Sequence, residues 1–283
     1  MIWQTSRFRI DLRRPQVMGI VNLTPDSFSG DGRLSEPGDV RAALAHCERL
    51  VSQGADLLDL GAESSRPGAA PLPLELERQR LLPVLAEVVR WGLPISVDTY
   101  KSEVMQAALD LGADIINDIW ALRSRGALEV VSAHPSCGIC LMHMHREPQT
   151  MQVQPMQGDV VPQVRAFLAQ AAQGLRQQAV AAERVVLDPG VGFGKTAAQN
   201  YALLHRQAEL MALGYPLLAA WSRKSAIGAA LGSPEQPAPL EQRLPGSLAA
   251  ALLAVERGAR VVRVHDVRET VQALKVWQAV QAS

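Results

Sequence analysis

The sequence is poor in cysteine, in aromatic residues and in net charge. Three cysteines among 283 residues are an odd number, and they do not form the even, dense set that a disulfide framework requires. Aromatic residues make up 4% of the chain, and 28 basic residues balance 28 acidic ones. A neutral chain has no general electrostatic attraction to nucleic acid or to an anionic membrane surface, so neither partner is expected. Any anionic ligand must be held by local groups.

Long apolar runs are also missing. No window approaches the ~20 apolar residues of a membrane-spanning helix, and the segment MIWQTSRFRIDLRRPQ lacks the apolar stretch of a signal peptide. The sequence therefore predicts a cytoplasmic protein. What the chain does contain is 48% apolar and 20% charged residues, the composition of a globular protein with a sizeable core.

Short apolar runs alternate with helical patterns along the whole chain. Sets such as Leu44, Cys47 and Leu50 recur at helical spacing and stop at a glycine, here Gly54. Nearly all-apolar strands separated by helices predict a parallel sheet covered by helices. Eight such units favour a TIM (β/α)₈ barrel over an open doubly wound sheet. The eight predicted strands are 17–21, 56–60, 93–97, 114–116, 138–142, 184–187, 216–220 and 260–264.

No segment reads as a linker between domains. The Pro-rich stretch GSPEQPAPLEQRLPG, residues 232–246, is predicted to be a long loop. The chain is therefore predicted to form a single domain over residues 1–283, with an N-terminal extension over residues 1–16. The segment TSRFRIDLRRPQV ahead of the first barrel strand is predicted to be a β-hairpin that closes the bottom of the barrel.

Polar side chains follow almost every predicted strand, and in barrels of this kind the active site is built at the C-terminal ends of the strands. Three carboxylates, two amides, several cations and no obvious nucleophile predict ligand binding and electrostatic catalysis, not covalent chemistry. The residues at or just after the eight runs are Asn22, Asp59, Asp98, Asn117, Met142 with His143, Asp188, Ser222 to Lys224, and Arg263 with His265.

These residue types match particular chemical groups. A carboxylate beside an amide suits a flat heterocycle, because the carboxylate accepts two N–H bonds and Asn supplies one donor and one acceptor. Arg263 and His265 suit a phosphate group, and the SRKS stretch, 222–225, suits a carbonyl or an anion. The role of Asp59 stays open between a helix cap, an internal ion pair with an arginine, and a place in the site; Asp118 stays open between a cap and a supporting role.

One segment imitates a phosphate-binding loop. PGVGFGKT contains the Gly-Lys-Thr ending of that motif, but the motif needs glycine at the position of Pro189. Lys195 and Thr196 are instead predicted to begin a helix.

Another segment imitates a zinc site. CGIC is followed by His143 and His145, yet Cys137 and Cys140 on one strand would point to opposite faces. Zinc is therefore disfavoured, and the lone His46 is predicted to be a surface or packing residue.

Eight motifs occur together and in one order: MGIVNLTPDSFSGDG, LLDLGAESSRPG, ISVDT, IINDI, LMHM, LDPGVGFGKT, WSRKS and RVHDV. In order and spacing they resemble the dihydropteroate synthase family, from about Met18 to about Trp277. The resemblance implies a TIM barrel that condenses 6-hydroxymethyl-7,8-dihydropterin pyrophosphate with 4-aminobenzoate. The products would be 7,8-dihydropteroate and pyrophosphate, in folate biosynthesis. The resemblance also implies Mg²⁺ as cofactor and a homodimer.

The resemblance assigns roles to the residues that match these motifs. Pterin would contact Asp98, Asn117, Met142, Asp188 and Lys224. Pyrophosphate would contact Asn22, Arg66, Arg263 and His265, and Asn22 would also bind Mg²⁺. The 4-aminobenzoate pocket would comprise Phe28, Ser65, Pro67, Phe193 and Ser222. Catalysis would depend on Asp98, Lys224, Arg263, His265 and Arg66, and segment 24–32 is predicted to be a mobile lid that excludes water.

The chain departs from the common family pattern in small ways. Ala62 stands where Gly is usual, Ser65 where Thr is usual and Val191 at a common Phe position, and none of these removes a group that the mechanism needs. Two other functions stay open. A pterin-binding methyltransferase domain would share the barrel but would not need the TPDSF loop or the SRKS stretch. A non-catalytic paralogue would bind pterin without synthesis.

Overall fold

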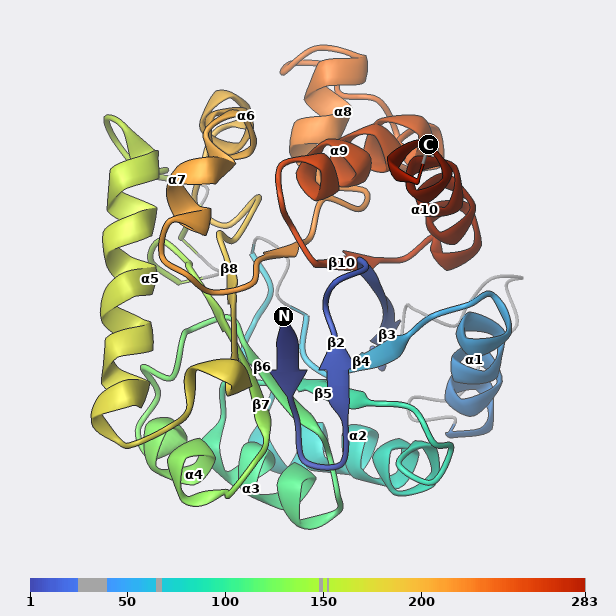
Figure 1. Ribbon diagram of the computed structural model, residues 1–283, viewed down its shortest axis with the longest axis vertical. Coiled ribbons are helices and arrows are strands. Elements are labelled where there is room, and N and C mark those ends of the chain that lie inside the picture. Colours follow the sequence, from blue (N-terminus) through green and yellow to red (C-terminus); the bar gives the residue numbers. More distant parts are fainter. Residues whose placement is uncertain (25–39, 65–67, 148–149, 152, 283) are drawn as a thin grey trace.

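The architecture is a parallel eight-stranded barrel surrounded by helices (Figure 1). The computed structural model describes residues 1–24, 40–64, 68–147, 150–151 and 153–282. The strands follow the order β8-β7-β6-β5-β4-β3-β10-β9, and a parallel bridge between Leu187 and Leu217 closes the ring. The strands are β3 (Gln16–Asn22), β4 (Leu57–Gly61), β5 (Ile95–Asp98), β6 (Ile115–Asp118), β7 (Gly138–Met142), β8 (Val185–Asp188), β9 (Leu218–Ala219) and β10 (Val261–Val264). The predicted barrel and its eight strands are confirmed.

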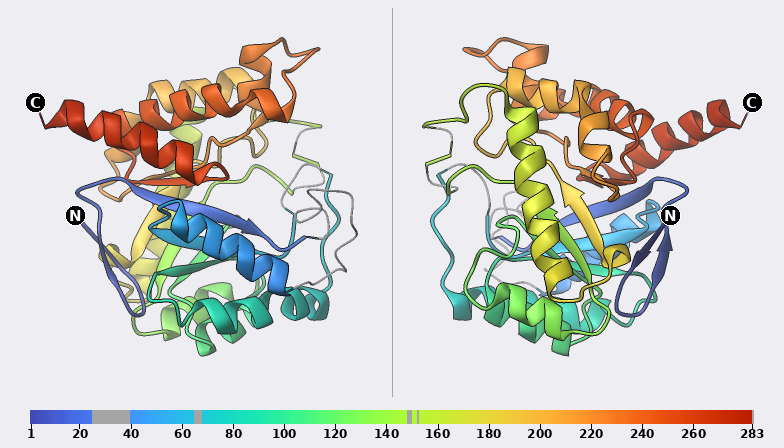
Figure 2. Two further views of the ribbon diagram at one scale, coloured as in Figure 1. Left: turned by 90° about the vertical axis from the view of Figure 1, so that its right-hand side faces the viewer. Right: turned by 60° about the vertical axis from the view of Figure 1, so that its left-hand side comes forward.

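Helices fill the connections and cover the outside of the barrel (Figure 2). One of them ends as the sequence predicts, because Gly54 adopts φ of 99° just beyond α1. The helices are α1 (Val40–Ser52), α2 (Leu74–Val88), α3 (Ser102–Asp110), α4 (Ala127–Ala133), α5 (Val160–Gln177), α6 (Ala197–His205), α7 (Gln207–Met211), α8 (Ser225–Leu231), α9 (Leu244–Glu256) and α10 (Val267–Gln281). None of these described helices is both long and apolar enough to cross a bilayer, and the cytoplasmic location remains a prediction.

An N-terminal hairpin closes one end of the barrel (Figure 1). Strands β1 (Ile2–Gln4) and β2 (Arg9–Asp11) pair antiparallel, slightly earlier in the chain than predicted. Trp3 is fully buried against the lowest layer of the barrel interior, and its Nε1 donates to the Arg184 carbonyl at 2.9 Å. The hairpin therefore covers the end of the barrel opposite the C-terminal ends of the strands.

Strand alternation explains why the interior is apolar below and polar above. Side chains two residues apart share a face of a strand. Leu57, Ile115, Val186 and Val261 form part of the apolar layer under the hairpin. Two residues further along the same strands stand Asp59, Asn117, Asp188 and Arg263. Because residues two apart share a face, each of these strands places one polar side chain inside the barrel at the mouth.

Candidate active site

A charged network lies at the centre of the mouth. The guanidinium of Arg263 on β10 donates from Nε to Asp59 Oδ2 at 2.6 Å and from a terminal nitrogen to Asp98 Oδ2 at 2.8 Å. Asn117 on β6 donates from Nδ2 to the same Asp59 oxygen at 3.2 Å. Four strands therefore converge on one arginine–carboxylate–amide cluster, and Asp59 is an internal ion-pair partner, one of the possibilities that the sequence left open.

Burial dominates the electrostatics of this cluster. Desolvation raises the pKa of Asp98 to about 7, with Arg263 opposing the rise and Asp59 adding to it. Burial by itself would lower the pKa of Arg263, but Asp59 and Asp98 outweigh it and the net shift is upward. The arginine therefore stays charged, while Asp98 is a carboxylate held near its point of protonation at neutral pH.

A second carboxylate lies beside the cluster at the end of β8. Asp188 is buried, and its Oδ1 accepts the backbone N–H of Gly190 at 2.7 Å. Burial raises its pKa, and the Gly190 N–H opposes that rise. Each carboxylate oxygen has two acceptor positions, so Asp188 can still accept N–H groups from a ligand. Met142, paired with Asp188 in the register of β7 and β8, supplies an apolar surface next to it.

Lys224 lies beside this site, with its ammonium over an aromatic ring. Its Nζ lies 4.4 Å from the centroid of the Phe193 ring, a cation–π distance. Burial lowers the pKa of Lys224 to about 8, helped by the charge of Arg263 and opposed by Asp188 and Asp98. The structure thus brings together Phe193 and Lys224, which the sequence assigned to neighbouring substrate pockets.

Ser222 and His265 form a pair just after β9 and β10. The Ser222 hydroxyl lies 3.0 Å from His265 Nδ1 and accepts the backbone N–H of His265 at 3.2 Å. Burial lowers the pKa of His265 to about 3, and Arg223 and Arg263 lower it further. The imidazole is therefore neutral in the free protein and adds no fixed positive charge to the mouth, and the contact of His265 with pyrophosphate stays a prediction.

The phosphate-loop imitation has a structural role. Lys195 is 3% exposed, and its Nζ donates to the carbonyls of Gly190 and Phe193 at 2.8 and 3.1 Å and of His143 at 3.4 Å. Burial lowers its pKa to about 7. Gly190 has φ of 68°, and a Cβ there would lie 1.8 Å from the His143 carbonyl oxygen. Thr196 caps α6 through a capping box, as the helix-start prediction requires.

Sequence reasoning missed a second charged cluster at the mouth. Lys101 bridges the carboxylates of Glu63 and Glu77, Thr99 donates to Glu77 at 2.6 Å, and Tyr100 donates to Glu63 at 2.8 Å. The cluster ties the loop after β4 to the loop after β5 and to helix α2. The only hint in the sequence was that Glu63 and Lys101 lie within or next to the GAESS and VDT motifs.

The structure places the residues of two sequence alternatives. Cys137 lies in the outer core and accepts a hydrogen bond from Arg184, whereas Cys140 points into the barrel interior, so they do not share a face. Within the described ranges, no three His, Cys, Asp or Glu side chains are placed to hold a metal ion. Asp118 accepts the backbone N–H groups of Trp120 and Leu122, both at 2.7 Å, so it stabilises a turn.

Several predicted site residues lie outside the described residues: Phe28, Ser65, Arg66, Pro67 and most of the predicted lid. Asn22, at the end of β3, is described and partly exposed beside Gly61 of β4. An amide oxygen is a ligand type that Mg²⁺ accepts, and Mg²⁺ usually completes its coordination with water and substrate phosphates. Asn22 is therefore chemically compatible with the predicted Mg²⁺ role.

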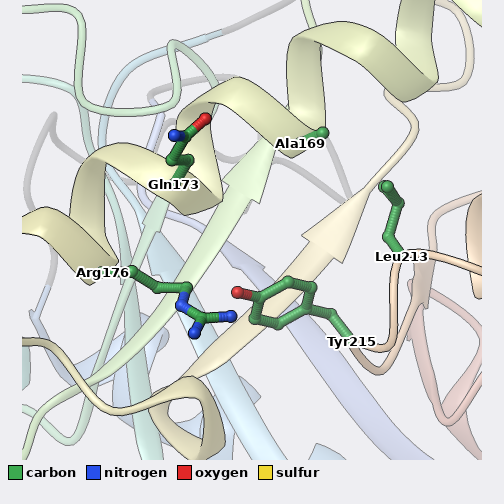
Figure 3. Close-up of a pocket in the computed structure, with 5 residues that line it drawn as sticks. All are labelled: Ala169, Gln173, Arg176, Leu213 and Tyr215. Atoms are coloured by element: carbon green, nitrogen blue, oxygen red, sulfur yellow. The ribbon is translucent and has the colours of Figure 1, made fainter.

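A separate pocket of about 430 Å³ lies on the outer wall (Figure 3). It is formed by α5 and by the segment that leads into β9, so it belongs to the side where β9 begins, away from the mouth. Its lining contains one charged side chain and none of the predicted site residues. The lining residues are Ala169, Gln173, Arg176, Leu213 and Tyr215.

The barrel and its polar mouth are those of a ligand-binding (β/α)₈ enzyme, and comparison with known families identifies the class. The model of the family described as pterin binding enzyme matches residues 18–265. The chain therefore belongs to the pterin-binding enzyme family.

Individual relatives narrow this class. The dihydropteroate synthase of Neisseria meningitidis serogroup B is 49% identical over 98% of this chain and 97% of the relative. The structure of Burkholderia cenocepacia dihydropteroate synthase complexed with 7,8-dihydropteroate superposes with a TM-score of 0.88 at 48% identity, over 99% of this chain and 96% of that one. The structure of Xanthomonas albilineans dihydropteroate synthase with 4-aminobenzoic acid superposes with a TM-score of 0.90 at 46% identity, over 100% of both chains. Within the family, the chain is thus one of the dihydropteroate synthases, and the predicted resemblance is confirmed.

Proposed function

We propose that this chain condenses 6-hydroxymethyl-7,8-dihydropterin pyrophosphate with 4-aminobenzoate to give 7,8-dihydropteroate and pyrophosphate. The single observation that carries the proposal is the convergence of Asp98, Asn117, Asp188 and Arg263 on one buried mouth, on a chain related to dihydropteroate synthases over nearly its whole length. Structures of relatives that hold 7,8-dihydropteroate and 4-aminobenzoic acid support the two substrate classes.

The pterin would lie between the buried carboxylates and Met142. Asp188 and Asn117 are polar groups at the ends of β8 and β6, suited to the N–H and ring-nitrogen edge of the heterocycle. Asp98 lies beside Asn117 in the register of β5 and β6. Lys224 would reach the carbonyl side, and Met142 would pack on the ring.

The diphosphate would meet Arg263, His265 and Asn22, together with Arg66, which lies outside the described residues. Arg263 uses two of its five N–H groups on Asp59 and Asp98, which leaves others for phosphate oxygens. The neutral His265 would act as a hydrogen-bond donor to phosphate, not as a fixed cation, while Ser222 holds the other side of its ring. Asn22 would hold Mg²⁺, which when bound would neutralise diphosphate charge.

The chemistry would be a dissociative substitution. The bond between the pterin methylene carbon and the diphosphate oxygen breaks, and both electrons leave on oxygen towards Arg263. The methylene is left cationic, and Asp98 and Asp188 stabilise that charge. The nitrogen lone pair of 4-aminobenzoate then forms the new C–N bond, and the nitrogen loses a proton to the released pyrophosphate or to water. An arylamine is already a nucleophile, which fits a mouth with no dedicated base.

The 4-aminobenzoate would lie near Phe193, with Phe28, Ser65, Pro67 and Ser222 as its further proposed contacts. Phe193 is held by the loop that Lys195 ties down, and its ring contacts the Lys224 ammonium. An aromatic ring at this position would face the arylamine substrate next to the pterin.

The chain is further proposed to work as a single-domain homodimer. Large apolar side chains are exposed on neighbouring helices α9 and α10, with Leu253, Val276 and Val280 at 46%, 68% and 64% exposure. Exposed apolar patches of this kind mark interaction surfaces. Sedimentation analysis of the purified protein measures this directly, and a monomer at micromolar concentration would remove the proposal.

One assay tests the activity. The purified chain is mixed with the pterin pyrophosphate, 4-aminobenzoate and Mg²⁺, and dihydropteroate and released pyrophosphate are measured. Pterin binding without product would favour the non-catalytic paralogue, and methyl transfer without condensation would favour the methyltransferase reading.

A further inference from the structure

Asp59 has no assigned part in the proposed reaction, although it is a fully buried carboxylate of the mouth. It is 0% exposed, and its Oδ2 accepts from both Arg263 and Asn117. No described residue donates to its other oxygen, Oδ1. A buried carboxylate with one oxygen unpaired costs stability, so its retention is better explained by the site than by the fold.

We infer that Asp59 is a positioning residue that fixes the direction of the Asn117 amide and so sets which heterocycle the barrel accepts. The inference rests on the proposed function, because it assumes that Asn117 meets the edge of the pterin ring. The two ends of an amide, C=O and NH₂, are nearly equal in shape, and only the hydrogen-bond partner decides which end faces where.

The partner is decided by Arg263. A guanidinium only donates, so the Asp59 oxygen that lies 2.6 Å from it is an acceptor. Asn117 bonds to that same oxygen and must therefore present its nitrogen to Asp59. Its Oδ1 and its second amide proton remain for the ligand. The order of acceptor and donor offered at the mouth is thus set by a residue that need not touch the ligand.

This order discriminates between two closely similar ring systems. A pterin shows a bare ring nitrogen, N1, beside an amino group, an acceptor next to a donor. Its 2-oxo analogue, lumazine, shows N1–H beside a carbonyl oxygen, which is the reverse order. An Asn117 amide that is free to turn would serve either ring, whereas one held by Asp59 serves only one. The structure therefore assigns Asp59 to the preference for 2-amino pteridines.

The test compares the affinities of pterin and lumazine by fluorescence titration, with no turnover required. Asp59→Leu removes the acceptor, and Asp59→Ser replaces it with a hydroxyl that both donates and accepts, so that a folded variant is obtained even if leucine is not tolerated. Both variants should lose at least about tenfold of the wild-type preference for pterin, the effect of one misdirected hydrogen bond. Asp59→Asn should keep the preference within about threefold, because its carbonyl must still face Arg263.

Asp114→Asn is the matched control, since Asp114 is also 0% exposed and paired with an arginine, but at the bottom of the barrel. It should leave the preference unchanged. The inference would be overturned if folded Asp59→Leu or Asp59→Ser kept the wild-type preference for pterin over lumazine. It would also be overturned if Asp59→Asn lost as much of that preference as the other two variants. A wild-type enzyme that forms no dihydropteroate would instead sink the proposed function, and the titrations would still report on Asp59.

Discussion

The two ends of the barrel each bury an aspartate against an arginine, and they use the pair differently. At the bottom, Asp114 accepts four hydrogen bonds on its two oxygens, three from Arg7 and one from the Ile95 N–H. At the mouth, Asp59 accepts two on one oxygen, and no described residue donates to the other. A fully satisfied buried carboxylate holds a fold together, whereas a partly satisfied one keeps polar capacity for a ligand at a cost in stability. The bottom is thus built for stability and the mouth for binding.

The largest effect on turnover is expected from Asp98→Asn at the mouth, with no loss of stability. The amide keeps the shape of the carboxylate but not the charge that would stabilise the pterin cation, so turnover should fall by about 10³-fold. Affinity for the pterin pyrophosphate, measured by calorimetry, should be largely kept, and the melting temperature should not fall. Near-wild-type turnover would remove Asp98 from the mechanism.

The opposite outcome is expected from Asp114→Asn at the bottom. Two of the four donors would face an amide NH₂ in place of an oxygen, because each oxygen accepts two of them, and Arg7 would lose its buried counter-charge. The free energy of unfolding should fall by about 3 kcal/mol. Urea denaturation measures the loss, and kcat/KM at a temperature well below the midpoint should be unchanged. An altered kcat/KM in the folded variant would contradict the division between the two ends.

The pH dependence of kcat/KM should report the mouth alone. Asp98, with its pKa raised to about 7, is ionised only above that value, so activity should fall as pH drops through about 7. Lys224, with its pKa lowered to about 8, loses its charge above that value, so activity should also fall as pH rises through about 8. The profile should be a narrow bell.

Two variants show which residue causes each limb of the pH profile of kcat/KM. Lys224→Arg should move the alkaline limb upward, because a guanidinium stays protonated, and residual turnover of Asp98→Asn should lack the acid limb. A limb that persists unchanged in both variants belongs to the substrates.

The smallest effect is expected from Lys195→Met, in the loop after β8 at the mouth. The variant removes the ammonium that ties the loop of Phe193 to the loop of His143. The KM for 4-aminobenzoate should rise by about three- to tenfold, because the aromatic wall is no longer held, while pterin affinity stays close to wild type. Lys275→Met, an exposed lysine on α10, is the control and should change neither. Equal losses in both affinities would show that the whole mouth, not one wall, depends on Lys195.

Much of the mouth could be predicted because strand ends are visible in a sequence. An apolar run ends where its last polar residue appears, and parallel strands bring their C-terminal ends to one side, so Asp98, Asn117, Asp188 and Arg263 were predicted as neighbours. Their bonding was not predictable. Asp59 and Arg263 are 204 residues apart, and no local pattern tells which of several carboxylates an arginine will choose.

The protonation states of the site residues could not be predicted from the sequence either. His265 looks like a phosphate-binding cation in sequence, but burial and two arginines lower its pKa to about 3, and burial depends on every element packed around the ring. Lys195 ends a segment that only imitates a nucleotide loop, and only the fold shows its ammonium enclosed by three carbonyl groups.

The sequence by itself determined the barrel, its closing hairpin, the helix end at Gly54, and the set of polar residues at the strand ends. These depend on periodicity and on local conformational preference, which a single segment contains. The tertiary structure alone decided which oxygen of Asp59 is occupied, which way Asn117 faces and which side chains remain charged. Those properties depend on distance and burial between segments far apart in the chain, and packing alone sets them.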